Sequence, residues 1–121
     1  MRPDWRVLAL VVLFLAGAVQ AQDRAPEARQ AAADLAYVLG QSHALRQACA
    51  GADDQYWRGR MLELLQAEAP DDAQKARLSQ SFNAGFAAGQ AGFPSCTAAA
   101  RAEGQRIAAR GAALASRLAS P

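Results

Sequence analysis

The stretch LAYVLGQSHALRQAC, residues 35–49, decides the fold that the sequence predicts. Five of its positions follow one another at steps of three and four residues, the spacing that lines one face of an α-helix: Leu35, Val38, Ser42, Leu45 and Cys49. Asp34 can cap the start of this helix, and Gly51 can end it. We therefore expect a helix between Asp34 and Gly51 whose apolar face ends in a cysteine.

That cysteine has one possible partner in the chain. Only two cysteines are present, Cys49 and Cys96, so a single intramolecular pairing exists. A redox pair or a metal site is the alternative, but these favour CxxC spacing or nearby histidines, and neither pattern occurs in the sequence. We predict a structural disulfide between Cys49 and Cys96 and no metal site, which fits an exported protein.

Three further segments show helical spacing and complete the predicted fold. They follow the aspartates at 53–54, the aspartates at 71–72 and the turn around Pro94. Their expected apolar faces are Trp57, Met61, Leu64 and Leu65; then Leu78, Phe82, Phe86 and Phe93; then Ala100, Gly104, Ile107, Gly111, Leu114 and Leu118. The prediction is an all-α fold, a small bundle of about four helices within a single domain at residues 34–119, stapled by one disulfide.

Two details of these segments carry further expectations. Gly85 and Gly89 lie four residues apart beside phenylalanines, which indicates that another helix backbone comes close to this helix. The aspartate pairs at 53–54 and 71–72 precede helices, so we interpret them as helix caps. Paired catalytic carboxylates are the alternative interpretation.

The N-terminal segment reads as a targeting signal. Arginines precede an apolar run at residues 7–16, and small residues follow, so we expect residues 1–21 to be a signal peptide cleaved after Ala21. An uncleaved membrane anchor is the alternative, but a span needs about 20 apolar residues. We expect a periplasmic protein without a stable membrane anchor. Residues 22–33 show no stripe of large apolar side chains and are predicted to be a flexible lead-in.

Composition limits the classes of protein that the chain can belong to. Its 121 residues are 52% hydrophobic and 20% charged, which favours one small folded domain over a disordered chain or a multidomain enzyme. Alanine supplies much of the apolar fraction, so we expect a thin core that depends on the disulfide. The net charge of +2 is too small for a nucleic-acid-binding surface.

Few residues can support catalysis. His43 is the only histidine, and we expect it to be partly buried and hydrogen-bonded to a carboxylate or carbonyl; a base or ligand role is the alternative. Trp57 falls on an apolar face, whereas Tyr56 and Arg58 flank it, so core packing is expected and a binding surface is the alternative. No phosphate loop, zinc spacing or nucleophile elbow occurs in the sequence. We expect no enzymatic activity and no cofactor.

Several runs of sequence also resemble a known family. They are LAYVLGQSHALRQAC at 35–49, WRGRM at 57–61, LLQAEAP at 64–70, FNAGF at 82–86 and CT at 96–97. Together they resemble an uncharacterised family of small exported alphaproteobacterial proteins, a domain of unknown function. The resemblance implies a periplasmic location and two cysteines and transfers no catalytic residue. Its motif contains the candidate binding residues His43, Arg46, Trp57, Arg58, Glu68 and Asn83.

These observations favour a binding protein. The leading hypothesis is a non-enzymatic periplasmic helical protein that binds another cell-envelope component, such as a protein, through an aromatic and arginine surface on the second and third helices. The alternative is a small-ligand module or a stress chaperone that exposes Phe82, Phe86 and Trp57. On the last helix, the arginines are interpreted as a solvated face, with an acidic partner as the alternative: Arg106, Arg110 and Arg117.

Overall fold

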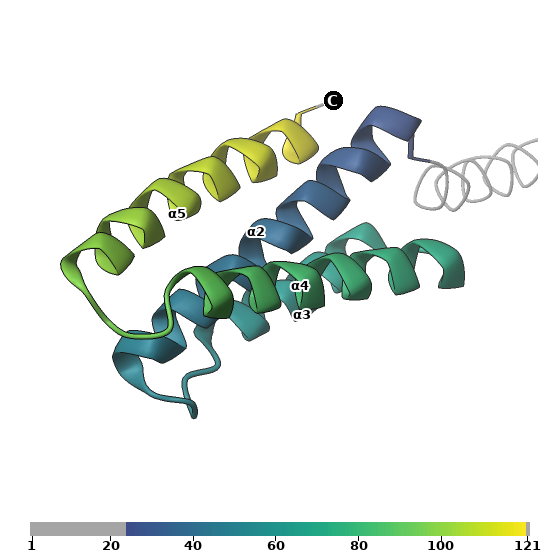
Figure 1. The fold of residues 1–121 in the computed structure, drawn as a ribbon. Coiled ribbons are helices and arrows are strands. Elements are labelled where there is room, and N and C mark those ends of the chain that lie inside the picture. Colours follow the sequence, from purple (N-terminus) through teal and green to yellow (C-terminus); the bar gives the residue numbers. More distant parts are fainter. Residues whose placement is uncertain (1–23, 121) are drawn as a thin grey trace, which may run out of the picture.

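Four helices make up the part of the chain that the computed structural model describes, residues 24–120 (Figure 1). They are α2 (Pro26–Ala50), α3 (Tyr56–Glu68), α4 (Asp72–Gly92) and α5 (Ala98–Ala119). No strand occurs between residues 24 and 120, which confirms the predicted all-α class. None of these helices combines the length and the hydropathy needed to cross a bilayer. The signal peptide predicted for residues 1–21 lies outside the described residues.

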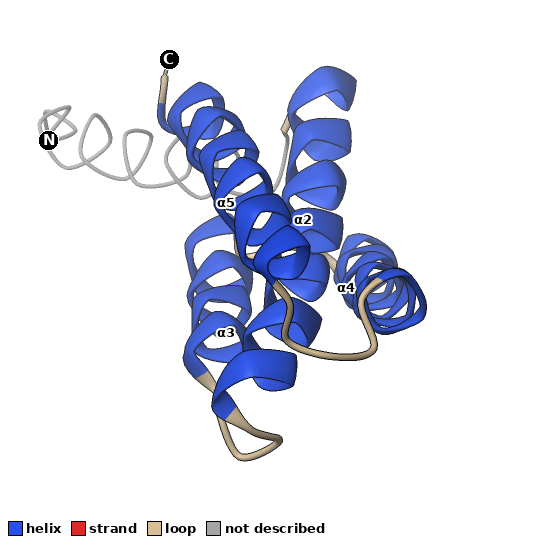
Figure 2. Ribbon diagram, turned by 60° about the vertical axis from the view of Figure 1, so that its left-hand side comes forward, coloured by secondary structure: helices blue, strands red, loops and turns tan. Residues whose placement is uncertain are grey.

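The central helix is α2, and each of the other helices packs against it (Figures 1 and 2). Its contact with α4 is the most extensive, followed by that with α5, whereas α3 and α4 touch only slightly. The largest buried side chains lie on α2 and on one face of each neighbour: Leu35, Val38, Leu39, Leu45, Met61, Leu78, Ile107 and Leu114. The three-to-four spacing in residues 35–49 therefore identifies the face that forms the core.

The start of α2 differs from the sequence-based prediction. The helix begins at Pro26, so the flexible lead-in predicted for residues 22–33 and the cap predicted at Asp34 are corrected for the described residues. Ala31, Ala32 and Ala33 are buried there, because their small side chains allow neighbouring helices to come close. A search for stripes of large apolar residues cannot detect such a face.

Glycines allow α2 and α4 to approach backbone to backbone. A Cβ atom on Gly40 would overlap the carbonyl oxygen of Phe82, and one on Gly85 would overlap the carbonyl oxygen of Tyr37. Gly89 also lies against α2, where a Cβ atom would come within 3.1 Å of a backbone oxygen. The close approach predicted from Gly85 and Gly89 is confirmed, and Gly40 is the matching residue on α2.

Polar caps begin two of the helices as the sequence predicts. The carboxylate of Asp71 accepts a hydrogen bond from the amide of Gln74 at 2.8 Å, at the start of α4. Thr97 caps α5 through its side chain in the same way. Asp54 precedes the N-cap position of α3, yet it still accepts a hydrogen bond from the Tyr56 amide at 3.2 Å. The cap predicted at the 71–72 pair is therefore confirmed at Asp71. The cap predicted at the 53–54 pair is corrected, because the N-cap of α3 is Gln55 and its side chain makes no cap hydrogen bond.

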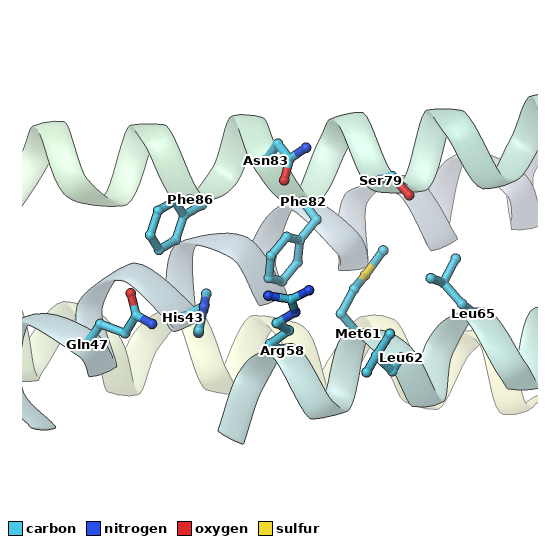
Figure 3. A pocket seen from close by; sticks show the side chains of 10 residues that line it. All are labelled: His43, Gln47, Arg58, Met61, Leu62, Leu65, Ser79, Phe82, Asn83 and Phe86. Atoms are coloured by element: carbon cyan, nitrogen blue, oxygen red, sulfur yellow. The ribbon is translucent and has the colours of Figure 1, made fainter. Parts of the chain in front are cut away.

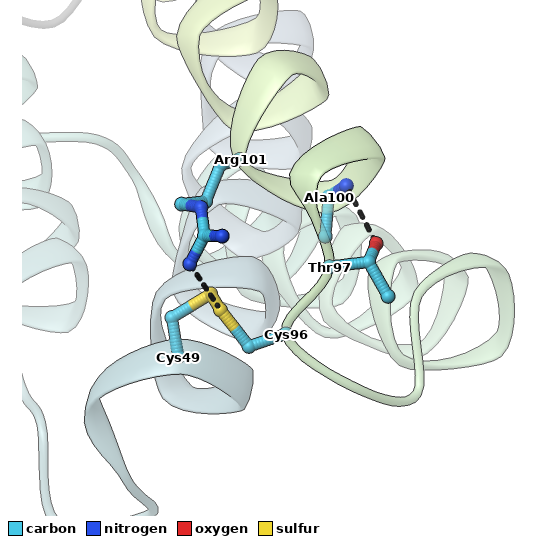
Figure 4. Close-up of a disulfide and its surroundings, with 5 residues drawn as sticks. All are labelled: Cys49, Cys96, Thr97, Ala100 and Arg101. Atoms are coloured by element: carbon cyan, nitrogen blue, oxygen red, sulfur yellow. Dashed lines mark hydrogen bonds between the residues drawn. A yellow bond between two sulfur atoms is a disulfide. The ribbon is translucent and has the colours of Figure 1, made fainter.

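A disulfide joins Cys49, in the last turn of α2, to Cys96, just before α5 (Figure 4). The Cα atoms are 4.7 Å apart, and the two residues are separated by 47 positions. Arg101 donates a hydrogen bond to the Cys96 sulfur at 3.5 Å. The predicted pairing is confirmed, and it holds the end of α2 beside the start of α5.

We expect Cys49→Ser to lower the free energy of unfolding by about 2–5 kcal/mol, because the unfolded chain gains the freedom of an opened loop. Thermal melting without reductant measures the loss. Wild-type protein melted with a thiol reductant is the matched comparison and should approach the midpoint of the variant. Equal midpoints for wild type and variant in oxidising buffer would contradict this role of the disulfide.

We expect Gly85→Ala to destabilise the fold by about 3 kcal/mol, since the added methyl group would overlap the Tyr37 carbonyl and separate α2 from α4. Gly59→Ala is the matched control, because a Cβ atom there meets nothing within 4 Å. Gly59 is the fourth residue of α3, and because alanine favours helix over glycine, this change should stabilise the fold by up to about 1 kcal/mol. Urea unfolding measures both, and a loss of stability in both variants would refute the proposed crossing.

Candidate functional site

A cavity of about 410 Å³ lies where α2, α3 and α4 meet (Figure 3). Each helix contributes residues three or four positions apart: His43 and Gln47; Arg58, Met61, Leu62 and Leu65; Ser79, Phe82, Asn83 and Phe86. We call this cavity the His43 pocket. Its size falls within the range of small-ligand sites, about 300–1,000 Å³. One wall is apolar and aromatic, and the polar groups come from all three helices.

His43 is buried against the aromatic wall of this pocket. Its side chain is 6% exposed, and its ring centre lies 5.7 Å from that of Phe82 and 5.2 Å from that of Phe86. The Nδ1 atom has no hydrogen-bond partner among residues 24–120. The expected hydrogen bond to a carboxylate or carbonyl is therefore not made by this atom, because the helix faces around it present phenylalanine rings.

The environment of His43 favours its neutral form. Burial lowers the pKa of the imidazole, the positive charge of Arg58 lowers it further, and Asp54 opposes them with a smaller effect. A pKa lowered from 6.5 makes the neutral ring the predominant form at pH 7. A neutral imidazole can donate one hydrogen bond and accept another.

Arg58 gives the pocket its charge. Its guanidinium extends from α3 toward the Phe82 ring of α4 (Figure 3), and no Asp or Glu is among the residues that line the cavity. No ion pair found within the described range includes Arg58. The electrostatic field inside the pocket is therefore positive, and it favours a ligand with an anionic group.

The six candidate residues from the sequence divide into two sets. His43, Arg58 and Asn83 come together in the His43 pocket, although they lie on three helices. Trp57 faces a different cavity on the other side of α3. It packs against the core as the sequence predicts.

The other two candidates form ion pairs that join separate parts of the chain. Arg46 binds the carboxylate of Asp54 at 2.9 Å, across the turn between α2 and α3. Glu68 is buried and binds Arg24 at 3.0 Å, and Arg24 also donates a hydrogen bond to the carbonyl of Leu118. These contacts give Arg46 and Glu68 structural roles.

Sequence reasoning missed most of the pocket walls. The sequence predicts Phe82 and Phe86 on an apolar helix face, and it indicates no role for Gln47, Leu62 or Ser79. The signal that could have found them is helical spacing from the candidates: Gln47 lies four residues after His43, Leu62 four after Arg58, and Ser79 four before Asn83. Residues one helical turn from a candidate share its helix face.

The arrangement suits binding better than bond-breaking. Arg58 can hold an anion, His43 and Asn83 can form hydrogen bonds, and the phenylalanines can contact an apolar body. Ser79 is the one hydroxyl side chain that lines the pocket, and no hydrogen bond found in the described range joins it to His43. Within residues 24–120, no group of three or more His, Cys, Asp or Glu side chains could hold a metal ion.

Comparison with known proteins identifies a family but no function. Residues 28–121 match the family model described as "Protein of unknown function (DUF2385)". The match covers all four described helices almost completely. No curated protein and no solved structure matches the chain.

The lowered pKa of His43 makes stability depend on pH. The unfolded chain, with the ordinary pKa of 6.5, takes up a proton before the folded chain does. The free energy of unfolding should therefore fall as the pH falls below about 6.5 and level off below the folded pKa. His43→Gln should flatten this part of the profile, measured by urea unfolding between about pH 5 and pH 8.

The single histidine allows a direct check of the same expectation. Only one imidazole is present in the chain, so its proton resonances titrate without overlap in an NMR experiment. We expect a folded-state pKa below 6.5. An unshifted or raised value would show that the ring is solvated or faces a carboxylate.

Proposed function

We propose that this chain, which belongs to the DUF2385 family of proteins of unknown function, is a non-enzymatic binding protein. Its ligand is a small anion with an apolar or aromatic body, and it binds in the His43 pocket. The observation that carries this proposal is the combination of Arg58, the unpartnered Nδ1 atom of His43 and two phenylalanine rings in one cavity without acidic side chains.

The charge of the ligand follows from Arg58. A guanidinium binds carboxylate or phosphate oxygens through paired, charge-assisted hydrogen bonds. Because no carboxylate side chain lines the pocket, a ligand anion would meet no competing protein anion there. A cation would meet repulsion from Arg58 with no compensating contact.

The apolar part of the ligand is inferred from the phenylalanines and the methionine that line the pocket. Phe82 and Phe86 are half-buried beside His43, and Met61 is buried and lines the same pocket. An apolar or aromatic group placed against these side chains would remove their remaining surface from water. The polar atoms of Asn83 and His43 would then select among such ligands by hydrogen bonding.

We also propose that the protein acts in the periplasm. The Cys49–Cys96 disulfide supports an oxidising compartment, and the apolar run at residues 7–16 is typical of an export signal. A small anion of the cell envelope is then the ligand class that we favour over an intracellular metabolite.

An envelope protein is a second candidate for the bound component. Leu62 lines the pocket from α3 and is 59% exposed, so it presents a large apolar side chain to solvent next to Arg58. An acidic side chain of a partner protein could bind Arg58 while apolar side chains cover Leu62. Such a partner would bind part of the surface predicted on the second and third helices, at Arg58 but not at Trp57, which lines a different cavity. The chaperone alternative requires the thin core to open, because Phe82, Phe86 and Trp57 are half-buried in this structure.

Titration calorimetry with 1-naphthoate tests the proposed ligand class. We expect saturable binding, and we expect Arg58→Gln to weaken it about tenfold or more, because a charge-assisted hydrogen bond contributes about 1.5–3 kcal/mol. Arg110→Gln is the matched control, since Arg110 is exposed on α5 far along the chain from the pocket residues. Neutral 1-naphthamide should bind less tightly to wild type.

The same variants separate the two candidates. If Arg58→Gln abolishes naphthoate binding, the small-ligand function is supported. If naphthoate and its amide bind equally, or if Arg110→Gln has the same effect as Arg58→Gln, the anion site in the His43 pocket is refuted. Two results together would favour the protein partner: naphthoate does not bind, and the protein crosslinks to an envelope protein in the wild type but not in Leu62→Glu.

A further inference from the structure

A second cavity lies on the opposite side of α3. It has a volume of about 470 Å³, and it lies between α3 and α5, with α2 as its floor. We call it the α3–α5 groove. It shares no lining residue with the His43 pocket, and Trp57 belongs to it although the neighbouring Arg58 belongs to the pocket.

The groove exists because α3 and α5 both pack on α2 but not extensively on each other. On α5 the wall consists of small residues, Ala112 and Ala115 among them. Gly111 brings α5 close to α2, since a Cβ atom there would lie 3.1 Å from a methyl group of Val38. The small side chains therefore leave an open channel above the aliphatic side chains of the floor.

One end of the groove is polar. Ser42 is 3% exposed, and its hydroxyl oxygen has no hydrogen-bond partner among the described residues. Tyr56 and Arg60 line the same cavity, and the Arg60 guanidinium donates a hydrogen bond to the Tyr56 hydroxyl at 3.2 Å. Glu63 lines the cavity as well and binds Arg60 at 2.9 Å. The buried Ser42 hydroxyl, which has no partner, indicates a place for one polar group of a ligand.

The other end of the groove is aliphatic. Arg46 contacts Tyr56 at one end of α2 and α3, and Arg24 binds Glu68 at the other, so these two helices run antiparallel. Ser42 therefore lies toward the end with Tyr56 and Arg60. Leu35 and Ala67 line the groove toward the opposite end.

We propose that the α3–α5 groove binds a single-chain fatty acid. The carboxylate is placed at the polar end, where Arg60 and the Ser42 hydroxyl can donate hydrogen bonds to it, and the alkyl chain runs over Leu35, Val38 and Leu39 toward Ala67. The ion pair between Arg60 and Glu63 does not prevent this, because both side chains are at least half exposed and such pairs are weak.

The dimensions favour a lipid chain over a protein segment. A cavity of about 470 Å³ belongs to the size class of small-molecule sites. A stable protein interface needs about 1,200 Å² or more of buried surface, which a channel of this size does not supply. A ligand with one polar end also matches the grouping of Ser42, Tyr56 and Arg60 toward one end of the groove.

Titration calorimetry of the full chain with monomeric dodecanoate tests the proposal. We expect one molecule bound per chain. Ala112→Phe fills the groove from the α5 wall and should weaken binding at least about tenfold. Ala113→Phe is the matched control, because Ala113 is exposed and does not line the groove, and its affinity should stay within about twofold of wild type. Thermal melting establishes that both variants fold.

A second pair of measurements tests the polar end. Arg60→Gln should weaken dodecanoate binding about threefold or more and remove the preference for dodecanoate over dodecanol. Binding that is absent at about 1 mM dodecanoate, or equal in Ala112→Phe and Ala113→Phe, would overturn the proposal. Loss of dodecanoate binding in Arg58→Gln with full binding in Ala112→Phe would place the fatty acid in the His43 pocket and would also overturn it.

Discussion

The backbone contact between α2 and α4 positions much of the rest of the structure. Gly40 and Gly85 remove the side chains that would hold the two helices apart, so the carbonyl oxygens of Phe82 and Tyr37 lie directly against the neighbouring helix. This contact also determines the site. His43 follows Gly40 by three residues, so the crossing brings its ring beside Phe82 and Phe86. The chain has few large apolar residues, so the close approach of the α2 and α4 backbones provides van der Waals contacts that bulky side chains provide in other domains.

Helical spacing made much of the fold predictable from the sequence. Leu78, Ile107 and Leu114 are buried where the three-to-four pattern places them, and the disulfide followed from there being only one possible pair. The first turns of α2 were missed because their buried residues are alanines, which carry no contrast between a polar and an apolar face. A search for large apolar side chains does not detect such a helix face, since its close packing depends on small side chains.

The candidate site was less predictable than the fold. Helical phase determines which residues of one helix share a face, but it does not determine which face of the next helix they meet. His43 and Asn83 come together where Gly40 lets α2 cross α4, and Arg58 joins them because α3 packs on α2. Arg46 and Glu68 bind Asp54 and Arg24 instead. Partners such as Glu68 and Arg24, 44 residues apart, have no signature in local periodicity.

The α3 helix separates the His43 pocket from the α3–α5 groove, and it is held mainly by α2. Trp57 and Leu64 line the α3–α5 groove, whereas the residues that follow them, Arg58 and Leu65, line the His43 pocket. Because α3 forms a wall of both cavities, a tilt of α3 that widened the His43 pocket would narrow the α3–α5 groove. A ligand that displaced α3 from one side would therefore change the volume available on the other side.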